Sequence, residues 1–144
     1  MCKISELVVM VIEPDKTTLQ NVCDSLNRIG ITHIVCVDNQ TDALDALGSN
    51  PDIDIILADY NEDSNSSHDI ILPLYLKKER PGILLILTSK EYSKSVVINS
   101  IRIGAADILD LRRENEVENL MEKWLILAKE KCKFRELLHG KRPA

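Results

Sequence analysis

Near its N-terminus the chain reads LVVMVIEPD at residues 7–15. Residues 7–12 are all apolar and rich in valine, as is typical of a strand that is buried on both faces. Asp15 can cap a helix, and the apolar residues between 19 and 29 recur at helical spacing. A buried strand that leads directly into an amphipathic helix forms one β–α unit.

The same alternation of short apolar run and helical segment recurs along the chain. Five β–α units with short connections predict one parallel sheet that is covered by helices on both faces. Gly30, Gly48 and Gly104 are expected to end helices. The predicted strands are Leu7–Ile12, His33–Val37, Ile53–Ala58, Ile83–Leu87 and Ala106–Leu109, and the later helices are Thr41–Leu47, Ile70–Lys78, Ser93–Ile103 and Glu114 to about Leu138.

Composition excludes several classes of protein. With 144 residues the chain fits one domain, and three tyrosines, one tryptophan and one phenylalanine offer little surface for stacking nucleic-acid bases. The net charge of −5 also argues against a nucleic-acid partner.

No apolar run approaches the roughly 18 residues of a membrane span, and no signal segment precedes the first strand, so a cytoplasmic protein is expected. Four scattered cysteines are expected to be reduced and mostly buried.

The charge is unevenly distributed between the body and the C-terminal end of the chain. Residues 128–144 contain six basic and two acidic residues, a net +4, which leaves −9 for residues 1–127. We therefore predict a domain at 1–127 and a basic helical extension at 128–144. Apolar residues of the last helix follow steps of three and four from Val117 to Leu138. That seam either packs on its own domain throughout, or the helix runs past the domain near Ala128 and pairs with a partner, as in a homodimer, or leads to an effector.

Acidic residues follow two of the predicted strands. Glu13 and Asp15 come after the first strand, Asp59 after the third, and Thr88 after the fourth. Because the carboxyl ends of parallel strands meet at one edge of the sheet, these groups are expected to share a site. Clustered carboxylates favour a hard cation such as Mg²⁺, and an aspartate beside such an ion can accept a phosphoryl group.

This arrangement resembles the receiver domain of bacterial two-component response regulators over about Leu7 to Leu127. The likeness also includes the turn Gly104-Ala105-Ala106-Asp107 before the fifth strand. It implies a flavodoxin-like, doubly wound sheet of five parallel strands in the order 2-1-3-4-5, here with an extended C-terminal helix. It further implies that Asp59 is the phosphoacceptor, that Thr88 is the switch hydroxyl, and that Glu13, Asp59 and Asn61 belong to a Mg²⁺ site. Asp15, one residue beyond the family's second acidic position, is the further candidate ligand of this site, which is expected to be weak.

The chain departs from the family at several positions, among them Glu62-Asp63, which stand in a longer loop where the family has Met-Pro. Pro14 stands where the family has its second acidic residue, and Leu111 stands where it has a lysine that contacts the phosphoryl group. Ile108 replaces the aromatic residue of the switch. Arg112 and Arg113 are the candidate substitutes for the missing lysine.

Two functions are compatible with these residues. The first is a non-enzymatic receiver that accepts phosphate on Asp59 from a sensor histidine kinase or a phosphotransfer protein and alters a protein–protein contact. The alternative is a pseudo-receiver, which would act as an interaction or dimerisation module without phosphorylation. Neither requires a membrane.

Overall fold

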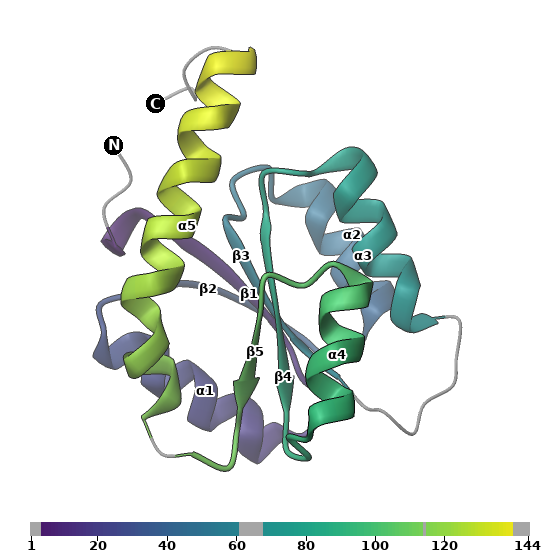
Figure 1. Cartoon of the computed structure of the whole chain (residues 1–144). Coiled ribbons are helices and arrows are strands. Elements are labelled where there is room, and N and C mark those ends of the chain that lie inside the picture. Colours follow the sequence, from purple (N-terminus) through teal and green to yellow (C-terminus); the bar gives the residue numbers. More distant parts are fainter. Residues whose placement is uncertain (1–3, 61–67, 114, 140–144) are drawn as a thin grey trace.

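The computed structural model describes residues 4–60, 68–113 and 115–139 (Figure 1). Five strands form one parallel sheet in the order β2-β1-β3-β4-β5, which confirms the predicted topology. Each predicted strand is present, with its boundaries moved by no more than two residues. The strands are β1 (Val8–Ile12), β2 (His33–Val37), β3 (Ile55–Asp59), β4 (Leu84–Ser89) and β5 (Asp107–Asp110).

Helices cover both faces of the sheet, so its strands are buried between two apolar layers (Figure 1). On one face α1 (Lys16–Arg28) and α5 (Glu116–His139) pack over alternate residues of β1 and β3. On the other face lie α2 (Gln40–Ser49), α3 (His68–Glu79) and α4 (Lys94–Ile103). A short 3-10 turn, η1 (Ile4–Glu6), precedes β1. This double cover explains the continuous apolar runs of the strands.

Side-chain caps fix where three of the helices begin. Asp15, Asn39 and Ser93 each accept a backbone N–H of the first turn of α1, α2 and α4. Gly104 follows α4 with φ +99°, a left-handed conformation that glycine adopts without strain. Gly48, however, lies inside α2 and does not end it as predicted, because glycine lowers helix stability without forbidding the conformation.

A buried tryptophan anchors α5 to the sheet. Trp124 is fully buried, and its Nε1 donates a 3.0 Å hydrogen bond to Asp107 Oδ2 at the start of β5. Lys123 Nζ lies 3.2 Å from the same oxygen. Ala128 is still buried, and the helix runs without a break across the predicted division at residues 127 and 128. That division stays a prediction.

Two expectations about local structure need correction. β3 begins at Ile55, two residues later than predicted, because Asp54 uses its side chain to accept the N–H of Val8. Cys23 is half-buried and Cys36 is exposed, so the thiols are not mostly buried among the described residues. Their Sγ atoms lie 3.4 Å apart between α1 and β2.

Candidate functional site

A small pocket of about 230 Å³ opens at the carboxyl edge of the sheet. It lies between the ends of β1, β3 and β4, where a doubly wound fold places its ligand sites. Three of the predicted acidic residues therefore come together as expected. The lining residues are Glu13, Pro14, Asp15, Asp59, Tyr60, Ser89, Lys90, Glu91 and Val96.

Glu13 is the buried carboxylate of this pocket. Its side chain is only 4% exposed, and its Oε2 accepts the backbone N–H of Asp15 at 3.1 Å. The other oxygen, Oε1, is buried and has no hydrogen-bond partner. Burial raises the pKa of Glu13, the Asp15 N–H lowers it, and the negative charge of Asp59 raises it further. The pocket therefore contains an acceptor oxygen that can serve a ligand.

Asp15 has a structural task as well as a place in the pocket lining. Its Oδ2 caps α1 by accepting the N–H of Thr18 at 3.0 Å and the hydroxyl of the same residue. Lys90 Nζ lies 3.3 Å from that oxygen, and both side chains are about half exposed. The hydrogen bonds from Thr18 are the main reason that the pKa of Asp15 is lowered. Asp15 therefore remains a carboxylate, with three donors already facing one oxygen.

Asp59 and Thr88 occupy adjacent positions on neighbouring strands. Asp59 ends β3 and is in register with Thr88 on β4, while the Tyr60 N–H donates to the Thr88 carbonyl at 2.9 Å. The Thr88 side chain is buried and does not line the pocket. Asn61, the fourth predicted metal ligand, lies outside the described residues.

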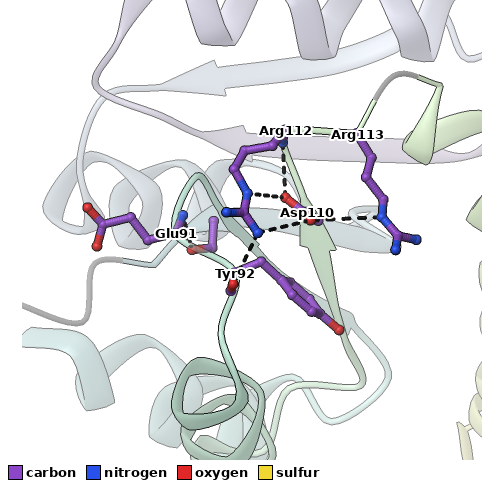
Figure 2. A network of polar contacts seen from close by, with 6 residues as sticks. Glu91, Tyr92, Asp110, Arg112 and Arg113 are labelled. Atoms are coloured by element: carbon purple, nitrogen blue, oxygen red, sulfur yellow. Dashed lines mark hydrogen bonds and ion pairs between the residues drawn. The ribbon is translucent and has the colours of Figure 1, made fainter.

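The two arginines that were predicted to replace the missing lysine lie at a neighbouring site (Figure 2). Arg112 donates from Nε to Asp110 Oδ1 at 3.1 Å and from Nη2 to the Tyr92 carbonyl at 3.0 Å. Arg113 Nε lies 4.0 Å from the same carboxylate. Burial opposes the charge on Asp110, but the Arg112 hydrogen bonds lower its pKa overall. Both arginines line an adjacent pocket of about 460 Å³, between α1 and the start of α5.

The residues fit a Mg²⁺ ion only in part. Within residues 4–60, 68–113 and 115–139, no three acidic, histidine or cysteine side chains are grouped so that they could hold a metal. Glu13 and Asp59 nevertheless lie in one pocket with an unpartnered oxygen, and Mg²⁺ in proteins is often held by one or two carboxylates plus water and phosphate oxygens. The donor set suits a weak, water-rich site.

Sequence reasoning missed Lys90. This residue follows β4 by one position and lines both pockets, on the boundary between the acidic site and the Asp110 cluster. A lone lysine in a polar loop has no periodicity or motif that distinguishes it from an ordinary surface residue. The one available signal was topological: Lys90 follows a strand whose carboxyl end faces the site.

Solved structures show which proteins share this architecture. A response regulator from Thermotoga maritima superposes with a TM-score of 0.70 at 23% identity, over 85% of this chain and 98% of that protein. The signal receiver domain of a putative Luxo repressor protein from Vibrio parahaemolyticus gives a TM-score of 0.71 at 17% identity, covering 93% and 98% of the two chains. A putative pilus assembly-related protein from Burkholderia pseudomallei gives 0.74 at 14% identity, covering 88% and 95%. The chain therefore has the fold of response regulator receiver domains.

Comparison of the sequence itself adds no further relative. No family model matches the chain, and no curated protein matches it. The similarity to receiver domains thus lies in three-dimensional structure. In a separate respect, no helix of the described residues has the length and apolarity needed to cross a lipid bilayer.

Proposed function

We propose that this chain is a receiver-like signalling domain that accepts a phosphoryl group on Asp59 and thereby alters a contact with another protein. The observation that carries the proposal is the pocket at the ends of β1, β3 and β4, in which Asp59 lies beside a buried glutamate with an unpartnered oxygen. The shared fold of receiver domains supports the same conclusion. The donor would be a histidine kinase or a phosphotransfer protein.

In the proposed step, one carboxylate oxygen of Asp59 attacks the phosphorus of the donor. An oxygen–phosphorus bond forms as the bond between phosphorus and the donor's leaving atom breaks, and the electron pair of that bond stays with the leaving group. Glu13 and Asp59 would hold Mg²⁺, which supplies positive charge against the phosphoryl oxygens. Thr88 lies in register with Asp59, so its hydroxyl is the proposed switch group that responds to the added phosphate.

Two partner contacts belong to this proposal. The charged pocket would receive the donor protein, and the C-terminal part of α5 would carry the output, as in a homodimer. The length of α5 supports the second contact, because Figure 1 shows this helix projecting beyond the sheet. The side chains of residues 131, 134 and 138, which complete the predicted seam, lie outside the described residues.

Incubation with acetyl phosphate and Mg²⁺, followed by intact-protein mass measurement, tests the function directly. The wild type should gain the mass of one phosphoryl group, with acetate as the leaving group, and Asp59→Asn should gain none. The asparagine keeps the shape of the side chain but lacks the nucleophilic carboxylate. Absence of a mass gain in the wild type would overturn the proposal and favour an interaction module that acts without phosphorylation.

A further inference from the structure

The acidic pocket requires a cation whenever it gains negative charge. Glu13, Asp15 and Asp59 already line it, and a phosphoryl group on Asp59 would replace the single negative charge of that carboxylate with about two. Like charges at this range repel one another unless a cation or hydrogen-bond donors compensate them. A Mg²⁺ ion held by two carboxylates would compensate part of this charge, which leaves a need for a positively charged side chain.

Lys90 is the one basic side chain among the described residues that line this pocket. Its charge already acts on the site, because it lowers the pKa of Glu13 and of Asp15. The arginines on the neighbouring loop are directed elsewhere, because Arg112 is held by Asp110 and by the Tyr92 carbonyl (Figure 2). Neither arginine is among the residues that line the pocket.

We propose that Lys90 exchanges partners, moving from Asp15 in the unmodified protein to the phosphoryl oxygens on Asp59 in the modified one. This inference rests on the proposed function, and it assigns the cation of the site to the loop after β4 rather than to the loop after β5. The substrate class is an acyl or histidine phosphate. The phosphoryl transfer itself remains as balanced above, and Lys90 adds only hydrogen bonds and charge.

The exchange requires little free energy because the present ion pair is weak. Lys90 and Asp15 side chains are 52% and 51% exposed, and ion pairs with such exposure contribute little to stability. Asp15 also keeps both hydrogen bonds from Thr18 after Lys90 leaves, so the cap of α1 persists. The surrounding loop is meanwhile held in place by the hydrogen bonds from Glu91 N to Ser89 Oγ and from Arg112 to Tyr92 O.

The test compares rates of phosphoryl gain from acetyl phosphate and Mg²⁺ in the full chain, followed by intact mass against time. Lys90→Gln should slow the gain by about tenfold or more, since it removes a charged donor to the reacting group. Lys90→Arg should recover part of the rate. Lys94→Gln, an exposed lysine at the start of α4, is the matched control and should react like the wild type. The thermal midpoint of Lys90→Gln should stay within about 3 °C of the wild type.

The outcomes separate this inference from the function on which it rests. If the wild type gains no phosphate, the proposed function fails and the inference fails with it. If the wild type gains phosphate and Lys90→Gln does so at the same rate, only the inference is overturned. A slow Arg113→Gln variant beside a fast Lys90→Gln variant would also overturn it, and would return the role to the loop after β5.

Discussion

At the amino edge of the sheet, Asp107 accepts hydrogen bonds from Ile108 N, Lys123 Nζ and Trp124 Nε1. At the carboxyl edge, Glu13 accepts one hydrogen bond and keeps a buried oxygen without a partner. Both carboxyl groups lie at strand ends of the same sheet, yet both oxygens of Asp107 accept hydrogen bonds, whereas one oxygen of Glu13 accepts none. A carboxylate whose oxygens are all hydrogen-bonded connects neighbouring elements, whereas a buried carboxylate with an unpartnered oxygen lowers stability and is typical of a functional site.

The largest effect should come from the amino edge. Trp124→Ala removes a fully buried ring from the core between α1, α5 and the sheet, and it should lower the free energy of unfolding by about 3–5 kcal/mol. Urea unfolding followed by circular dichroism measures this change. Trp124→Phe keeps most of the packing but loses the bond to Asp107, so it should cost about 2 kcal/mol. Equal losses in both variants would contradict a stabilising role for that hydrogen bond.

An intermediate effect is expected at the cap of α1. Asp15→Ala leaves the first-turn N–H of Thr18 without its acceptor and should cost about 1 kcal/mol in urea unfolding. Asp15→Ser offers a hydroxyl acceptor at the same place and should recover most of that loss. If serine destabilises the chain as much as alanine does, the capping bond is not what Asp15 contributes.

The smallest effect, and one of opposite sign, should come from Glu13. Because burial raises the pKa of Glu13 in the folded state above its ordinary value, the folded protein binds more protons than the unfolded one in the pH window between the unfolded and the folded pKa. Stability is therefore lost as pH rises through that window. The Glu13→Gln variant has no carboxyl group to titrate at this position, so its free energy of unfolding relative to that of the wild type should be greater at pH 7 than at pH 4.

Urea unfolding at both pH values measures this difference. Glu91→Gln, an exposed glutamate on the same loop edge, controls for the removal of one negative charge. If the stability of Glu13→Gln changed with pH in parallel with that of the wild type, burial would not raise the pKa of this carboxyl group. The contrast between the two edges of the sheet would then disappear.

Much of the fold was predictable because its signals are local. Buried parallel strands are apolar throughout. Residues such as Asp15 and Ser93 cap helices through hydrogen bonds to backbone N–H groups only three residues further along the chain. The errors arose where a distant contact prevailed or where a local signal was too weak to decide. β3 starts late because Asp54 bonds to Val8 on another strand. α2 continues one residue past Gly48, because glycine weakens a helix without forbidding its conformation.

For the site, the sequence predicted which strand ends meet but not which side chains contact one another there. The rule that strand ends converge predicted that Glu13, Asp15 and Asp59 would meet at one pocket, and the predicted cap by Asp15 is confirmed. No spacing showed that the capping oxygen would also face Lys90. The sequence position of Arg112 and Arg113 relative to the family's lysine predicts that they replace it. In the structure both arginines instead form ion pairs with Asp110. The place of Lys90 depends on the three-dimensional path of the chain after β4, which periodicity does not encode.

The length of α5 has a mechanical consequence. Its 24 residues form a rod of about 36 Å. The rod begins beside the loop that carries Arg112 and Arg113 and ends past the opposite edge of the sheet (Figure 1). Trp124 holds the first half of the helix against β5, so it is the natural fulcrum of any tilt. A tilt of about 5° about this residue would displace the end of the helix, about 22 Å away, by about 2 Å, as at the long arm of a lever.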